Sequence, residues 1–164
     1  MIWGCFAGNK LGPIVFVDGT VNADKYIELL RETVLPFLDA LLEDGTTNIV
    51  FQQDNATPHT ANRTRAWLEN VLKERGIALM DWPPNSPDMS PIENLWARLK
   101  LELHRRYPDT ASLRGNPNTV KQILIPSLME VWWNIGEEVL NALIESMLQR
   151  VNALWKAKGW YTGY

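Results

Sequence analysis

Apolar residues change their spacing several times along the chain, and each change predicts an element of secondary structure. Stretches 1–7 and 13–18 carry aromatic and branched side chains and predict two strands, joined by a turn over 8–12. Apolar side chains at helical spacing then predict a helix over 23–43. Pro36 removes a backbone donor inside this helix and should kink or split it.

A strand–helix–strand pattern follows. Residues 47–53 predict a strand, 58–75 a helix, and 77–80 a second, short strand. Two strands joined by a helix favour parallel pairing with a right-handed crossover. The proline-rich stretch 82–87 fits neither a helix nor a central strand, and it predicts a shaped loop.

The clearest helical pattern comes after this loop. Its apolar positions form one stripe, made by Ile92, Leu95, Trp96, Leu99 and Leu103. Two further helices are expected over about 119–134 and 137–157. The order of elements therefore predicts an α/β layer with a helical C-terminal cover.

Composition and charge narrow the class of protein. The 164 residues fit one domain, and a net charge of −3 with a pI near 5.4 argues against a dedicated nucleic-acid-binding module. The single cysteine excludes an internal disulfide and favours a reducing compartment. No apolar run approaches the length of a membrane span, so we expect an intracellular protein.

Basic residues gather in the second half of the chain. Any contact with DNA should use this stretch, although solvated helix faces would show the same charges. The basic candidates are Arg98, Lys100, Arg105 and Arg106.

Two acidic residues stand where strand and helix ends meet solvent. Asp54 follows the apolar run 48–51, and Glu93, 39 positions later, falls in the first turn of the clearest helix. Carboxylates delivered in this way can share a divalent cation, because hard cations such as Mg²⁺ prefer oxygen ligands. Each also has a local interpretation: Asp54 can close a turn, and Glu93 completes a capping box with Ser90. His59 can order the start of its helix.

The motifs around these carboxylates resemble those of mariner-type (Tc/mariner superfamily) DDE transposases. They are Gln52-Gln53-Asp54-Asn55 with the nearby His59, and Trp82-Pro83 leading to Ser90-Pro91-Ile92-Glu93-Asn94-Leu95-Trp96. The resemblance implies an RNase H-like mixed sheet flanked by helices, within one catalytic domain over residues 1–164. It implies that Asp54 and Glu93 are the second and third catalytic carboxylates and ligands of Mg²⁺ or Mn²⁺.

The resemblance also implies what the printed sequence lacks. In the family, the first catalytic Asp lies on a strand before the stretch that matches Met1 to Phe6. We therefore expect a truncated domain, without its first strand, that does not cleave DNA by itself.

The expected partner is DNA, contacted through His59 and the basic candidates, with a possible homodimer, a nuclear location, no membrane and no small-molecule substrate. The alternative is a transposon-derived relic without enzymatic activity that binds DNA or a protein partner.

Overall fold

The computed structural model describes residues 1–84, 86–160 and 162. The chain forms two compact units. One, here the central unit, contains Met1 and Val17–Pro87; the other, the terminal unit, contains Ile2–Phe16 and Asp88–Tyr164. Among the described helices, none is both long and apolar enough to cross a membrane.

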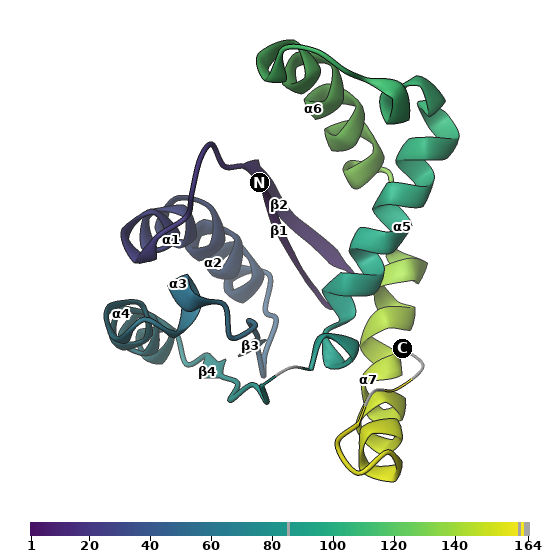
Figure 1. Ribbon diagram of the computed structural model, residues 1–164. Coiled ribbons are helices and arrows are strands. Elements are labelled where there is room, and N and C mark those ends of the chain that lie inside the picture. The colour runs from purple at the N-terminus through teal and green to yellow at the C-terminus, as the bar shows by residue number, and fades with distance from the viewer. Residues whose placement is uncertain (85, 161, 163–164) are drawn as a thin grey trace. The chain divides into compact units, whose positions relative to one another are not determined.

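The terminal unit begins with a hairpin. Strands β1 (Ile2–Ala7) and β2 (Lys10–Phe16) pair antiparallel, as Figure 1 shows. The connecting turn covers only the two residues between them, so the expected turn over 8–12 was too long. Pro13 lies inside β2, where the pairing register shifts opposite β1. Because strand pairing is already irregular at this point, the missing N–H of Pro13 weakens the sheet little.

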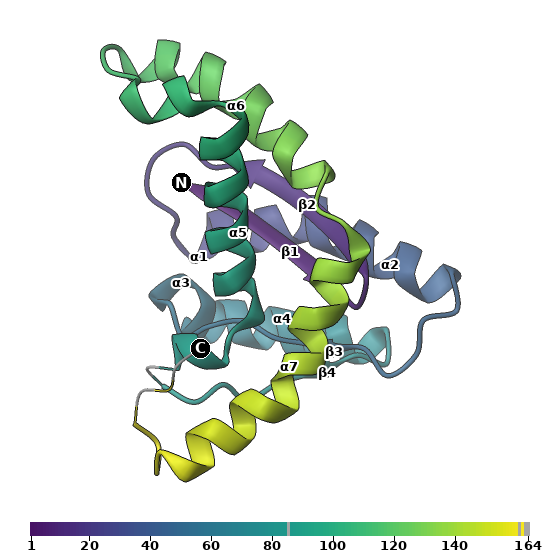
Figure 2. The ribbon, with the colours of Figure 1, turned by 90° about the vertical axis from the view of Figure 1, so that its right-hand side faces the viewer.

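Three long helices complete this unit. They are α5 (Pro91–Arg106), α6 (Pro117–Trp133) and α7 (Glu137–Lys156), with the 3₁₀ turn η3 (Pro108–Ser112) between the first two (Figure 2). The helix predictions are confirmed to within a few residues. One apolar core joins these helices to the hairpin, and its buried members are Ile14, Leu95, Leu99, Leu128, Val131, Trp132 and Leu140.

A pair of tryptophans lies at the centre of that core. Trp132 is fully buried, and its indole Nε1 donates a hydrogen bond to the carbonyl of Gly12 at 3.0 Å. The ring of Trp96 stacks against it, with 5.4 Å between centroids. The hydrogen bond satisfies the one polar atom of a buried indole, and it fixes α6 to the hairpin.

The central unit contains the split helix that Pro36 predicted. Its parts are α1 (Ala23–Leu29), the π-helical segment η1 (Leu30–Val34) and α2 (Leu35–Glu43). The N–H of Leu35 bonds to the carbonyl of Leu30, five residues back. This wider turn directly precedes Pro36, which has no N–H to give to the α-helical ladder.

The strand–helix–strand unit is also present, in shorter form. Strands β3 (Val50–Phe51) and β4 (Ala78–Leu79) pair in parallel, which confirms the predicted pairing. The single helix expected between them was wrong. The chain forms α3 (Thr57–Thr60) and α4 (Asn62–Glu74), separated at Ala61, whose ψ of 133° is extended.

Candidate catalytic carboxylates

Asp54 lies in the loop that leaves β3. Its Oδ1 accepts a hydrogen bond from the backbone N–H of Ala56 at 3.0 Å, which is the local turn expected from its position. The side chain is 62% exposed. The turn therefore fixes one carboxylate oxygen and leaves most of the group open to solvent.

His59 contacts the same oxygen from the following turn. Its Nδ1 lies 2.6 Å from Oδ1 of Asp54, although the approach is too bent for a well-directed hydrogen bond. The His59 side chain is 17% exposed, so it faces the carboxylate more than solvent.

Asn55 connects two loops of the central unit. Its Nδ2 donates a hydrogen bond to the carbonyl of Trp82 at 2.9 Å. Asn55 follows β3 and Trp82 follows β4, so the bond joins the segments that leave the carboxyl ends of two parallel strands. Such strand ends are where α/β folds commonly place their ligands.

Glu93 lies in the first turn of α5. Ser90 is the N-cap and Pro91 the first helical residue, as the sequence predicted. The full capping box was wrong, because the Ser90 side chain makes no capping hydrogen bond. Glu93 is exposed, and within the described part of the chain its carboxylate makes no hydrogen bond or ion pair. The helix start thus leaves this carboxylate available to a ligand.

The segment before α5 is held by a basic residue that the sequence analysis did not single out. Arg150 on α7 is only 2% exposed. It donates to the carbonyl of Asp88 at 2.6 Å, to Oδ1 of Asn94 at 2.9 Å and to Oγ of Ser146 at 2.8 Å. These bonds fix the turn and the first helical turn on either side of Glu93. The position of Arg150 between Met147 and Leu154 on α7 was the available signal.

The basic candidates do not form a free positive patch. Arg98, Arg105 and Arg106 surround Glu102 at 3.2, 2.9 and 3.8 Å. The hydrogen bond from Arg105, with the charges of all three arginines, holds the pKa of the Glu102 carboxyl below its usual range. Lys100 instead borders an apolar cavity of about 220 Å³ beside Leu99 and Leu103. Glu102 therefore offsets part of the charge available to DNA.

These observations bear on whether the candidate side chains can bind a divalent cation. The described residues contain no cluster of three or more His, Cys, Asp or Glu side chains able to hold a metal. Asp54 and Glu93 belong to different units, and their expected proximity stays a prediction. Each nevertheless offers exposed carboxylate oxygen, and this fits Mg²⁺ or Mn²⁺ by ligand type.

Comparisons with known proteins agree with the motifs. The model of the family described as DDE superfamily endonuclease matches residues 2–114. The Tcb1 transposase of Caenorhabditis briggsae is 34% identical over all 164 residues, and the Tc1 transposase of Caenorhabditis elegans is 32% identical. The chain spans 54% of the length of each of these relatives.

A solved structure supports the fold independently. The catalytic domain of Mos1 mariner transposase has a TM-score of 0.66 and 22% identity, over 91% of this chain and 68% of that one. This likeness confirms the expected RNase H-like fold, and the relatives confirm the resemblance to mariner-type transposases. Taken with the family match over residues 2–114, these findings show that the chain belongs to the DDE superfamily endonucleases.

Proposed function

We propose that this chain is part of the catalytic domain of a DNA transposase, and that Asp54 and Glu93 hold the divalent cations of its DNA-cutting site. The observation that carries the proposal is the Asp54 carboxylate, which is largely exposed yet fixed through Oδ1 by the Ala56 amide, with His59 in contact with the same oxygen. A carboxylate held through one oxygen keeps the other for a cation. Both compact units would then belong to one catalytic domain.

The cation is proposed from ligand chemistry and from relatives. Structures of the Mos1 catalytic domain are described with Mg and with Mn, and a Mos1 paired end complex with Mn. Asp54 and Glu93 would hold such cations, which would serve to activate a water or a DNA 3′-hydroxyl and to stabilise the departing oxygen. Carboxylate oxygens are the ligands that Mg²⁺ and Mn²⁺ prefer.

The residues of this chain have distinct tasks in that site. Asp54 and Glu93 supply the oxygen ligands. The Ala56 amide holds the Asp54 carboxylate in one orientation, and His59 packs against the same oxygen. The hydrogen bond between Asn55 and Trp82 connects the adjoining loops. Arg150 fixes the start of the helix that carries Glu93. Such fixed ligands lower the cost of reorganisation during the reaction.

DNA is the proposed partner, with α5 as the contacting element. Arg98, Arg105 and Arg106 are on this helix, and phosphate contacts from such residues give salt-dependent binding without sequence readout. We assign His59 to the carboxylate and not to DNA, because its ring packs inside the central unit. A homodimer and a nuclear location remain predictions.

Metal binding separates this proposal from a relic that only binds DNA. We expect the chain to bind Mn²⁺, and we expect both Asp54→Asn and Glu93→Gln to weaken binding, as measured by electron paramagnetic resonance of free Mn²⁺. Mn²⁺ binding that neither substitution changes would refute the proposed site.

A further inference from the structure

A buried tyrosine from a distant part of the sequence packs on His59. Tyr26, on α1, is 2% exposed, and its ring stacks on the imidazole with 4.1 Å between centroids and 29° between planes. Its hydroxyl donates a hydrogen bond to Oε1 of Gln53 at 2.9 Å. A buried phenol needs such a partner, so both the ring and the hydroxyl have a defined orientation.

Gln53 closes a circuit among these side chains. Its Nε2 donates to the backbone carbonyl of His59 at 3.3 Å, while its Oε1 accepts from Tyr26. Gln53 also directly precedes Asp54 in the chain. Two hydrogen bonds and one ring contact therefore link Tyr26, Gln53 and His59 in a closed circuit. His59 is the member of this circuit that contacts the Asp54 carboxylate.

The backbone around His59 cannot fix the position of the His59 side chain by itself. His59 lies in α3, which is four residues long. A helix of one turn has too few internal hydrogen bonds to be stable alone, so its side chains take their positions from tertiary contacts. For His59 these contacts are the Tyr26 ring, the Gln53 amide and the Asp54 carboxylate.

We propose that Tyr26 is a positioning residue for the Asp54 carboxylate, acting through His59. By stacking on the imidazole and orienting Gln53, Tyr26 keeps Nδ1 of His59 against Oδ1 of Asp54. Oδ2 would then be left open to a divalent cation. This inference rests on the proposed function, because it assigns the purpose of the arrangement to cation binding at Asp54.

A purely structural role of Tyr26 leads to a different expected result. If Tyr26 only fills the core of the central unit, replacing it lowers stability and leaves metal affinity unchanged. If it positions His59, metal affinity falls even where the fold is intact. Partners that hydrogen-bond metal ligands typically alter affinity by about 10- to 100-fold when they are replaced.

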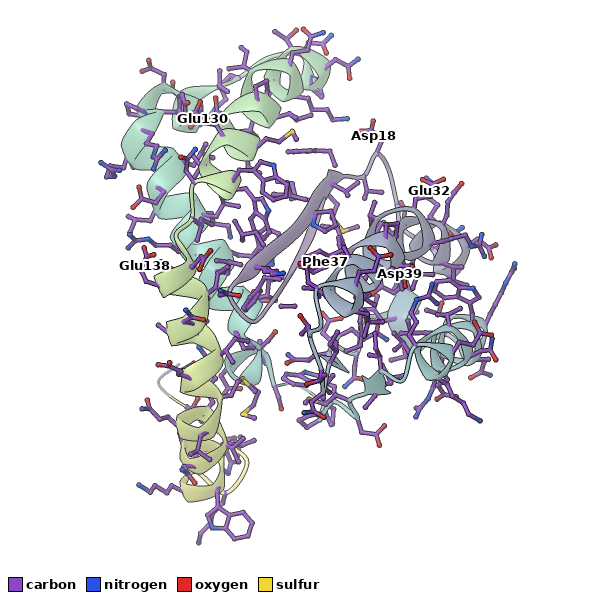
Figure 3. The ribbon with its side chains drawn as sticks, turned by 180° about the vertical axis from the view of Figure 1, so that it is seen from behind. Asp18, Glu32, Phe37, Asp39, Glu130 and Glu138 are labelled. Atoms are coloured by element: carbon purple, nitrogen blue, oxygen red, sulfur yellow. The ribbon has the colours of Figure 1, made fainter. Side chains whose placement is uncertain are left out.

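The test compares Mn²⁺ dissociation constants and melting temperatures of matched variants of the whole chain. Tyr26→Phe keeps the ring and removes the hydroxyl. Tyr107→Phe is the matched control, because it also removes one hydroxyl hydrogen bond, at 2.5 Å to Glu130, in the other unit (Figure 3 labels Glu130). His59→Ala removes the intermediary. Gln53→Leu breaks the circuit at its other member, should Tyr26→Phe fail to fold.

We expect Tyr26→Phe to raise the Mn²⁺ dissociation constant about 3- to 10-fold, the factor that one hydrogen bond is worth. His59→Ala should raise it about 10- to 100-fold. Tyr107→Phe should leave it unchanged. In the His59→Ala background, Tyr26→Phe should have no further effect, because the path to Asp54 is already broken.

Each other outcome overturns a specific part of the account. If Asp54→Asn still weakens binding, an unchanged dissociation constant for Tyr26→Phe, or for Gln53→Leu, shows that the Tyr26 hydroxyl and Gln53 do not position His59. An equal loss with and without His59 shows that Tyr26 does not act through the imidazole. Insensitivity to Asp54→Asn, or no Mn²⁺ binding at all, refutes the proposed metal site and the positioning role together.

Discussion

Gly4 on β1 allows the hairpin to approach the tryptophan pair of the terminal unit. A Cβ at this position would lie 2.8 Å from Cη2 of Trp96 and 3.3 Å from Cη2 of Trp132. Favourable carbon–carbon contacts lie at about 3.5–4.0 Å, so Gly4→Ala forces a displacement. Trp132 cannot easily yield, because it is fully buried and bonded to Gly12.

The size of the effect follows from two opposing terms. Overpacking a filled core costs about 1–3 kcal/mol. Replacing glycine by alanine in a strand restricts the unfolded chain and returns about 0.5–1 kcal/mol. We therefore expect a net loss of about 1–2 kcal/mol in the free energy of unfolding. For a chain of this size, each kcal/mol lowers the melting temperature by about 2–4 °C.

Thermal unfolding of four proteins tests this reasoning: wild type, Gly4→Ala, Trp96→Leu and the double variant. Trp96→Leu removes the ring atom nearest the new methyl group, so Gly4→Ala should cost less in that background. Gly8→Ala is the control, since no atom lies within 4 Å of its Cβ and its cost comes from a φ of 55°. An equal cost of Gly4→Ala in both backgrounds would show that the Trp96 contact does not limit this position.

Three further predictions concern charged groups. The hydrogen bonds from Arg75, which directly follows α4, hold the pKa of Asp39 on α2 below its usual 3.8 (Figure 3 labels Asp39). The Asp39–Arg75 pair should therefore stabilise the central unit at neutral pH and lose this contribution as the pH falls below 3.8. In urea unfolding, Asp39→Asn should be less stable than wild type at neutral pH, and this difference should shrink on acidification. Glu102→Gln should free three arginines, which would strengthen DNA binding and steepen its salt dependence in a filter-binding titration. Arg150→Met should lower stability by about 2 kcal/mol or more, because the carbonyl of Asp88 and the amide of Asn94 lose their buried donor. Unaltered unfolding of Asp39→Asn or Arg150→Met, or weaker DNA binding by Glu102→Gln, would contradict the respective assignment.

Local patterns predicted the elements whose causes are local. The stripe from Ile92 to Leu103 predicted α5, because an amphipathic helix needs only its own spacing to be recognised. Pro36 predicted the split between α1 and α2 from a missing donor. The parallel pairing of β3 and β4 followed from chain connectivity.

Tertiary contacts decided the features that the sequence did not reveal. In the sequence, Arg150 resembles a surface charge. In the structure it is buried and donates to three acceptors, which lie on α5, on the turn before α5 and on α7 itself. Tyr26 fitted the apolar stripe of its helix, and nothing within that helix indicated a contact with His59. The break at Ala61 has no local signal in the residues around it. Such contacts join residues that are far apart in sequence, and spacing alone does not encode them.

The candidate carboxylates were recognised for a different reason. Asp54 and Glu93 were identified by motif and by the chemistry of oxygen ligands, and the structure adds what surrounds each one. Asp54 has both a local turn and an exposed carboxylate, so its two interpretations are compatible. For Glu93 the capping interpretation is weaker, because the N-cap side chain makes no capping bond.

The central claim is that Asp54 and Glu93 bind the same divalent cation. A crystal structure of the chain grown with Mn²⁺, with the ion located by its anomalous scattering, measures this directly. We expect one ion bound by carboxylate oxygens of both residues, at about 2.0–2.6 Å as for hard cations and oxygen ligands. An ion held by other residues, or two carboxylates on opposite faces of the molecule, would contradict the account.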